Sequence, residues 1–327
     1  MSEELRDGLV AEVQAGEVRA IAEAMAIVDD LRRDGFLRRQ RLAAELATGT
    51  PSHHSIIGLT GPPGAGKSTL AGALIRAWVD AGSGVGMVAV DPTSQRSGGA
   101  LLGDRARLRF GPKEPVFMRS LATRHRLGGL APATHELASV LRAAYPRTLV
   151  ETVGVGQSEV AVEHVCDSVV LVIQPGSGDA LQFMKAGILE IPDLFVVHKA
   201  DLGAPATRTR NDLESILALG PGPGADPDWK TPVLSVSAQT GDGLGDLVEA
   251  LDEHRRYLID SGQGERRRSR SRIARVLDSF QSTYGSHGLE LLGGRDAAIA
   301  RAREIDGTDL DVFAELAALS GLASGGR

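Results

Sequence analysis

The chain has 327 residues, 42% of them hydrophobic, a formal net charge of −6 at pH 7 and one cysteine, Cys166. A chain of this length can bury a large core and hold more than one structural unit. The negative charge disfavours a protein built to bind nucleic acid or anionic membranes, and a single cysteine excludes an internal disulfide, as suits a reducing cytosol. We find neither a signal-peptide pattern nor an apolar run near the ~20 residues that a membrane span requires, so we expect a cytoplasmic protein without membrane contact.

The first 50 residues show apolar side chains at three- and four-residue steps, as at Leu9 and Val13 and again at Val18, Ile21 and Met25. This spacing predicts two or three helices, ended by the turn-forming residues 48–51 (TGTP). We therefore expect an N-terminal helical region, residues 1–50, that packs on a nucleotide domain or on a second subunit. Nothing in it suggests chemistry.

From residue 51 onward, nearly continuous apolar strands alternate with helical segments. The predicted strands span residues 55–60, 85–90, 148–153, 168–173, 194–197 and 233–236. Such strands are typical of an α/β fold with a mainly parallel sheet covered by helices on both faces, and its active loops lie at the carboxyl ends of the strands. We assign residues 51–262 to this domain and residues 263–327 to a C-terminal helical extension, with Thr308 as the N-cap of its last helix.

Residues 61–69 (GPPGAGKST) match the phosphate-loop pattern G-x-x-x-x-G-K-[ST] in full, between a predicted strand and a predicted helix. The glycines allow successive backbone N–H groups to converge on a phosphate, and the helix N-terminus adds positive charge. Lys67 is expected to bridge the β- and γ-phosphates, and Ser68 to bind Mg²⁺. The predicted nucleotide-binding residues of the loop are Gly61, Gly64, Ala65, Gly66, Lys67, Ser68 and Thr69.

Carboxylates follow two other strands. Asp91 ends the strand at 85–90 and can reach Mg²⁺ directly or through water, and Asp104, after a glycine-containing loop, is a second candidate. A helix cap is the alternative role for both. Glu151 ends a third strand, and the N–H of Gly154 is expected to contact the γ-phosphate. We predict Lys67, Asp91, Glu151 and Gly154 as catalytic residues, and Ser68, Asp91, Asp104 and Glu151 as Mg²⁺ ligands.

A further loop, residues 174–178 (QPGSG), has the composition of a moving segment. It leads into a helix that carries Asp179, Gln182 and Lys185. We predict a third switch segment here, and the alternative is a plain strand-to-helix turn with Asp179 as its cap.

Residues 198–201 (HKAD) nearly match N-K-x-D, the guanine-reading motif of GTPases. Asp201 is expected to accept hydrogen bonds from two guanine donors that adenine lacks, while the stem of Lys199 lies along the base. Ser237 and Ala238 form the second part of the guanine site, where a backbone N–H is expected to donate to the guanine O6. His198 replaces the asparagine that ties this loop to the phosphate loop, and a neutral imidazole can make one such bond but not all. We expect a weakened guanine preference, and the alternative is a relaxed or altered choice of nucleotide.

Together these motifs resemble the methylmalonyl-CoA-mutase-associated GTPases of the MeaB type, also labelled ArgK or LAO/AO transport ATPase. The matching stretches are residues 58–69, 89–94, 98–104 and 150–159, of which ETVGVGQSE at 151–159 is the most specific. The resemblance covers roughly residues 10–285. His198, residues 174–177 and residues 120–129 depart from the family pattern.

The resemblance implies a SIMIBI-class P-loop GTPase that forms a homodimer through its C-terminal arm. It implies a chaperone that binds GTP/GDP with Mg²⁺ and gates the loading, protection or reactivation of an adenosylcobalamin-dependent acyl-CoA mutase. Hydrolysis is expected to be slow without this partner. An adenosyltransferase as a further partner is left open. The resemblance also gives phosphate and Mg²⁺ roles to Lys67, Ser68, Asp91, Asp104 and Glu151, and makes Asp179, Gln182 and Lys185 the switch that answers to the mutase.

Three other functions are alternatives. A nickel-insertion GTPase is disfavoured because such proteins carry clusters of Cys and His ligands. An ATPase or kinase linked to amino-acid transport is disfavoured by the near N-K-x-D motif. The five arginines in residues 266–272 could bind nucleic acid, but no aromatic platform accompanies them, so a solvated helix face or a dimer or partner contact is favoured.

Overall fold

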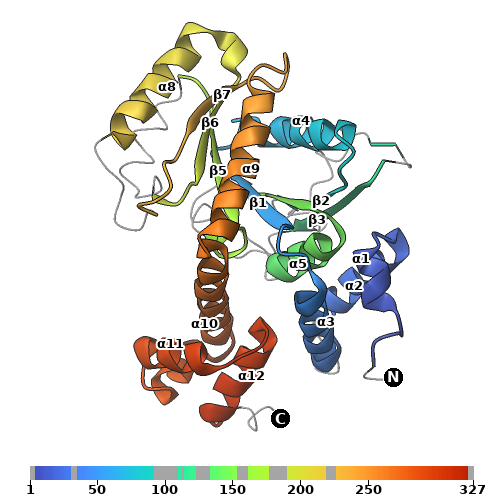
Figure 1. Cartoon of the computed structure of the whole chain (residues 1–327). Coiled ribbons are helices and arrows are strands. Elements are labelled where there is room, and N and C mark those ends of the chain that lie inside the picture. Colours follow the sequence, from blue (N-terminus) through green and yellow to red (C-terminus); the bar gives the residue numbers. More distant parts are fainter. Residues whose placement is uncertain are drawn as a thin grey trace, which may run out of the picture.

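The computed structural model of the chain (Figure 1) describes residues 4–30, 35–91, 110–111, 114–122, 133–152, 161–176, 190–218 and 226–322. Of Asp91 it describes the backbone alone. No helix in these residues is long and apolar enough to cross a membrane.

The centre of the described part is a seven-stranded sheet in which every neighbouring pair is parallel, in the order β3-β2-β4-β1-β5-β6-β7. The predicted α/β class with a parallel sheet is confirmed. Burial on both faces explains why β1, β5 and β6 are continuously apolar. The strands are β1 (Ser55–Thr60), β2 (Val85–Asp91), β3 (Val116–Ala122), β4 (Arg147–Glu151), β5 (Ser168–Ile173), β6 (Leu194–His198) and β7 (Val233–Val236).

The edge strand β3 was not predicted. Its sequence, VFMRSLA, places Arg119 and Ser120 in the middle of an apolar run. The described side chains of this strand are only half-buried, because it has a neighbour on one side alone. An edge position of this kind does not require the continuous apolar sequence by which the other strands are recognised.

Helices cover both faces of the sheet and bury two separate apolar layers (Figure 1). One layer contains α4 (Lys67–Asp80) and α9 (Leu244–Asp260). The other contains α5 (Thr134–Ala144) and the N-terminal helices α1 (Leu9–Gln14), α2 (Val18–Asp29) and α3 (Phe36–Gly49). The N-terminal helices therefore pack on the nucleotide domain of their own chain. Towards the other edge of the sheet, α8 (Ala204–Leu217) packs Leu213 against β6 and β7.

The C-terminal extension continues directly from α9. Figure 1 shows α10 (Gln263–Leu291) running on from α9, with α11 (Arg295–Glu304) and α12 (Asp309–Leu319) at its far end. Between α9 and α10 only Ser261 and Gly262 are non-helical, and Gly262 takes a left-handed φ of 68°. The three helices share a small core of their own. The predicted N-cap is confirmed, because Thr308 and Asp311 form a reciprocal capping box at the start of α12.

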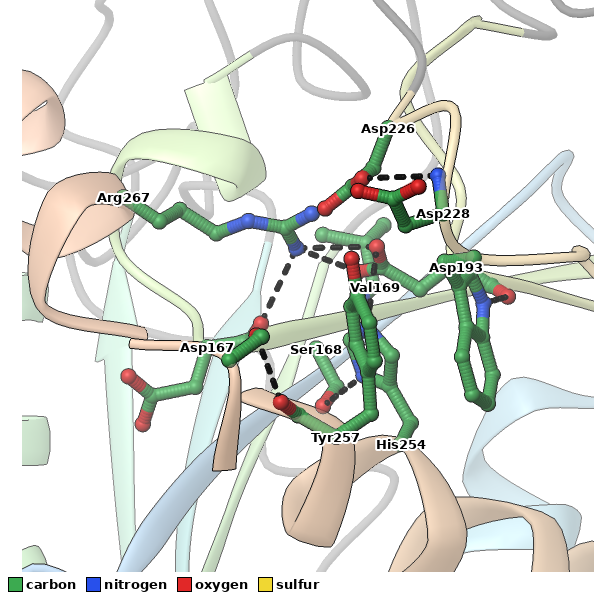
Figure 2. Close-up of polar contacts among 11 residues, drawn as sticks. Asp167, Ser168, Val169, Asp193, Asp226, Asp228, His254, Tyr257 and Arg267 are labelled. Carbon is green, nitrogen blue, oxygen red and sulfur yellow. Dashed lines mark hydrogen bonds and ion pairs between the residues drawn. The ribbon is translucent and has the colours of Figure 1, made fainter. Parts of the chain in front are cut away.

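The arginine run of α10 attaches this extension to the nucleotide domain. Arg267 Nη1 donates to both carboxylate oxygens of Asp193, which precedes β6, and each distance is 2.8 Å (Figure 2). The same nitrogen donates to the carbonyl oxygen of Asp167 at 3.1 Å, and Arg268 pairs with the Asp167 carboxylate at 3.3 Å. Burial alone would raise the pKa of Asp193, but His254 and Arg267 lower it overall. Much of the run therefore makes contacts within its own chain, whereas a solvated helix face or a dimer or partner contact was predicted.

Candidate functional site

The predicted site residues that the structure describes lie at the carboxyl ends of the parallel strands. The phosphate loop follows the central strand β1, and Glu151 ends the neighbouring strand β4. His198 ends β6, two strands away on the other side, and Ser237 follows β7. This arrangement follows from the topology alone, because parallel strands place all their carboxyl ends together.

The phosphate loop has the backbone that its glycines allow. Gly61, Gly64 and Gly66 have φ angles of 137°, 78° and 93°. A Cβ atom at Gly61 would lie 2.1 Å from the carbonyl oxygen of Val172, and one at Gly66 would lie 2.4 Å from His198 Nδ1. Both positions therefore need glycine for conformation and for space.

The first turn of α4 completes the phosphate site. Gly66 is the N-cap of this helix and provides no side-chain cap, so the initial N–H groups are suited to bind phosphate oxygens. The Lys67 ammonium is buried and donates to the carbonyl oxygens of Gly61 at 2.8 Å and Pro62 at 3.1 Å. These contacts hold the positive charge over the loop.

Ser68 and Glu151 meet across the two central strands. Ser68 Oγ donates to Glu151 Oε1 at 2.5 Å, and Glu151 is 7% exposed. A hydroxyl and a carboxylate oxygen are the kind of ligand that Mg²⁺ takes beside nucleotide phosphates, so the donor set fits this ion. Asp91 is the last residue of β2, at the same carboxyl end of the strands. Ala89, two residues before it, pairs with Glu151 of β4.

On the base side, two side chains hold the ends of β6 and β7 together. Ser237 Oγ donates to Asp201 Oδ1 at 2.6 Å, while Asp201 itself is exposed. Ser237 is fully buried, and its oxygen also accepts from Thr240 N at 3.2 Å. The hydroxyl can therefore orient the Asp201 carboxylate towards a ligand in the adjoining space.

Lys199 reaches back to the phosphate loop. It takes a left-handed backbone conformation with φ 58°, alone among the non-glycine residues described. Its Nζ donates to the carbonyl oxygen of Gly64 at 2.8 Å and to Gln174 Oε1 at 3.2 Å. The Gln174 contact was not foreseen, although the place of this residue at the end of β5 could have indicated it.

His198 links the base side to the phosphate loop by two hydrogen bonds. Its Nδ1–H donates to the Ala65 carbonyl oxygen at 2.8 Å, and its Nε2 accepts from Ala238 N–H at 3.4 Å. The pKa of His198 is lowered, mainly by burial and further by Lys199, against the opposing effects of Ala65 and Asp201. A neutral ring with the proton on Nδ1 satisfies both partners. The hydrogen bond to Ala65 is the single bond to the phosphate loop that a neutral imidazole was expected to make. The weakened preference for guanine stays a prediction.

Several predicted residues lie outside the described residues. They are Asp104, Gly154, Asp179, Gln182, Lys185 and the side chain of Asp91. Within the residues that are described, no group of three or more His, Cys, Asp or Glu side chains is placed to hold a metal ion, so the nickel-insertion alternative gains no support.

A phosphate loop on the central strand of a parallel sheet, a strand-end carboxylate beside it and a near N-K-x-D motif two strands away define a P-loop GTPase. The family model described as Methylmalonyl Co-A mutase-associated GTPase MeaB matches residues 21–284. The chain belongs to this family, and it is a GTPase.

Individual relatives agree with this assignment. A protein of Pyrococcus abyssi named as a GTPase is 42% identical over 316 residues, which cover 94% of this chain and 93% of the relative. The mouse mitochondrial methylmalonic aciduria type A homolog is 37% identical over 211 residues, 63% of this chain and 50% of its own. A crystal structure of an LAO/AO transport system kinase has the same fold, with a TM-score of 0.68 and 24% identity over 98% of this chain and 95% of that one.

Proposed function

We propose that this GTPase is a chaperone that gates adenosylcobalamin loading of an acyl-CoA mutase such as methylmalonyl-CoA mutase, and protects or reactivates that enzyme. The observation that carries the proposal is the family match over residues 21–284, which spans every described strand of the sheet. The name of the mouse relative points to the same branch of metabolism. The proposal also includes action in the cytoplasm and an adenosyltransferase as a further partner, and these two parts do not rest on the family match.

In the proposed nucleotide complex, the N–H groups of Gly61 and of residues 64–69 and the Lys67 ammonium bind the phosphates, and Asp201 binds the guanine. Mg²⁺ would neutralise charge on the β- and γ-phosphate oxygens. Ser68 would hold it directly, Asp91 directly or through water, and Glu151 through water, with Asp104 as a further ligand. Gly154 N–H would contact the γ-phosphate.

The switch is the residue set Asp179, Gln182 and Lys185. It follows β5, and Gln174 at the end of that strand already contacts Lys199 beside the phosphate loop. We propose that this segment senses the γ-phosphate and presents the result to the mutase. Hydrolysis is then slow until the mutase completes the site.

The C-terminal extension, residues 263–327, is the proposed dimerisation unit, in line with its separate small core. Size-exclusion chromatography with light scattering on the full chain tests this. A monomer at micromolar concentration would remove dimerisation from the proposal and leave the nucleotide chemistry intact.

The deciding experiment for the nucleotide is calorimetric titration of nucleotide-free protein with Mg²⁺ and GDP, then with ADP. We expect GDP to bind at least about a hundredfold more tightly, because Asp201 would accept hydrogen bonds from two guanine donors that adenine lacks. Equal binding would reopen the transport-ATPase alternative. The mutase role is tested by mixing the GTP-bound chain with apo-methylmalonyl-CoA mutase and adenosylcobalamin. Loading that is identical with GTP, GDP or no chaperone would remove it.

A further inference from the structure

A cavity of about 550 Å³ lies where the N-terminal helices, the nucleotide domain and the C-terminal arm meet. Its walls come from α3, α5 and α10, from the turn before β5 and from residues 307–311 at the start of α12. Ile56, near the amino end of β1, forms part of its wall. The cavity therefore lies at the amino end of this strand, whereas the phosphate loop follows its carboxyl end. Gln40 of α3 donates a hydrogen bond to Asp311 of α12 and joins two of the walls. The volume is within the range of small-molecule sites.

The cavity is lined by more positive than negative charge. Five arginines contribute to its wall, namely Arg39, Arg142, Arg268, Arg272 and Arg275. Its three aspartates already have partners in the chain. Asp167 pairs with Arg268 at 3.3 Å, Asp309 pairs with Arg275 at 2.7 Å, and Asp311 belongs to the capping box of α12.

The remaining carboxyl, Glu136, balances little of this charge. Burial, and to a smaller extent the neighbouring Asp309, raise its pKa to about 7. It is therefore only partly ionised at neutral pH. His135 beside it adds no positive charge, because burial and then Arg275 lower its pKa to about 3.

Arg142 has a guanidinium Nε that is buried without a hydrogen-bond partner. The Nε atoms of Arg39 and Arg272 in the same wall also lack one. Burial lowers the pKa of Arg142, and Arg268 and Arg275 add to this effect, while Asp167 opposes it. A buried guanidinium with unused donors is stabilised by an anion that it can pair with.

The cavity wall also has an apolar part. Ala43, Val165 and Leu310 line the cavity and are only partly buried, so they offer apolar surface to a ligand. We propose that this cavity binds an aliphatic carboxylate, whose carboxylate group pairs with Arg142 and whose chain lies against Ala43, Val165 and Leu310. Neither the nucleotide site nor the proposed mutase partner uses these residues, so this inference does not depend on the proposed function.

The test is calorimetric titration of the full GDP-bound chain with octanoate, and with 1-octanol as the neutral probe of the same length. We expect octanoate to bind and octanol to bind at least about tenfold more weakly, because a hydrogen-bonded ion pair is lost. Arg142→Gln should weaken octanoate binding at least about tenfold. The matched control is Arg266→Gln, an exposed arginine of α10 outside the cavity wall, which should change nothing.

GDP affinity of each variant, measured in the same experiment, shows whether the nucleotide site and the fold are intact. If Arg142→Gln does not fold, Ala43→Phe fills the cavity without touching the charge and should abolish octanoate binding. Absence of octanoate binding to the native chain overturns the proposal. Equal binding of octanol and octanoate overturns it as well. So does octanoate binding that is unchanged in folded Arg142→Gln or, if that variant does not fold, in Ala43→Phe. These outcomes count whatever the GDP and mutase experiments show.

Discussion

The Nδ1 atom of His198 lies 2.8 Å from the carbonyl oxygen of Ala65, so the imidazole joins the base side of the site to the phosphate loop. The same ring accepts a hydrogen bond from the N–H of Ala238 through Nε2. One neutral histidine thus links two segments that approach each other only at the sheet edge. This link depends on protonation, whereas an asparagine in its place would not.

We predict that GDP binding has a pH dependence that comes from His198. Its pKa is lowered from the ordinary 6.5, so the ring is neutral at pH 7. As the pH falls through the lowered pKa, Nε2 gains a proton and can no longer accept from Ala238 N–H. GDP affinity should therefore be intact at pH 7.5 and fall by up to about tenfold towards pH 5, the scale of one hydrogen bond.

Calorimetric titration of GDP at both pH values measures this effect, with His198→Asn as the control. An amide does not titrate, so the variant retains only the pH dependence of the phosphates. If His198→Asn loses as much affinity as the native chain, the histidine is not responsible.

The Asp201 carboxylate should decide the base. Asp201→Asn replaces one acceptor oxygen with a donor, so GDP affinity should fall at least about a hundredfold while ADP binding stays weak. Ser237→Ala removes the hydroxyl that donates to Asp201 at 2.6 Å and should cost about tenfold. Displacement of a fluorescent GDP analogue measures the GDP affinity of both variants and ranks them against the native chain. Equal losses for the two variants would mean that Ser237 does more than orient the carboxylate.

The Ser68–Glu151 pair predicts a separation of nucleotide binding from Mg²⁺ binding. Glu151→Gln keeps the size of the side chain and a hydrogen-bond acceptor for Ser68, which is at 2.5 Å in the native pair. GDP affinity in EDTA should be unchanged, whereas its increase on adding Mg²⁺ and the GTP hydrolysis rate should fall at least about tenfold. Phosphate release and GDP titration with and without Mg²⁺ measure this. A native response to Mg²⁺ would remove Glu151 from the ion site.

The sequence predicts those parts of the site that depend on one local motif or on strand direction. The phosphate loop is a contiguous pattern, and parallel strands bring His198 and Glu151 to the same edge whatever the loops between them do. The ion pair between Arg267 and Asp193 could not be predicted, because its partners are 74 residues apart and the path of α10 has no local signal. The cavity around Arg142 could not be predicted either, because its walls come from segments that are far apart in the chain. Edge strand β3 was missed because half-burial does not impose an apolar pattern.

Glu136 should make the stability of the protein fall with rising pH. Its pKa is about 7 in the folded state against an ordinary value of 4.5. Between these values the folded chain binds the proton more tightly than the unfolded chain, so the free energy of unfolding decreases as the pH rises through this window. Glu136→Gln removes this loss and should be more stable than the native chain at pH 8, by about 1–2 kcal/mol, because part of the residue is exposed and the full shift is not expected.

Urea unfolding at pH 4.5 and pH 8 measures the difference. At pH 4.5 the native carboxyl is protonated in the folded state, and the stability gap between the two proteins should be smallest. A gap that is the same at both pH values would show that the carboxyl does not titrate in this window.

Arg267 is predicted to be the main electrostatic attachment of the C-terminal arm. Asp193 is 4% exposed, and its carboxylate lies 2.8 Å from Arg267 Nη1 and 3.3 Å from His254 Nε2. Arg267→Gln leaves this buried charge with His254 and the N–H of Val169, which donates to Asp193 Oδ2 at 2.8 Å, and we expect a loss of about 3–5 kcal/mol in the free energy of unfolding. The matched control is Arg266→Gln, an exposed neighbour on the same helix, which should stay within about 0.5 kcal/mol.

The double variant Arg267→Gln with Asp193→Asn separates loss of the ion pair from loss of packing. With the buried charge removed, part of the stability should return, because the uncompensated carboxylate is the costly element. Trp229 reports on the same place, since its Nε1 donates to the Asp193 carbonyl oxygen at 2.9 Å and its ring lies 4.6 Å from that of His254. Its fluorescence in the folded state should therefore shift in Arg267→Gln and not in Arg266→Gln. A single variant that unfolds with native stability would mean that packing of α10, rather than this ion pair, holds the arm.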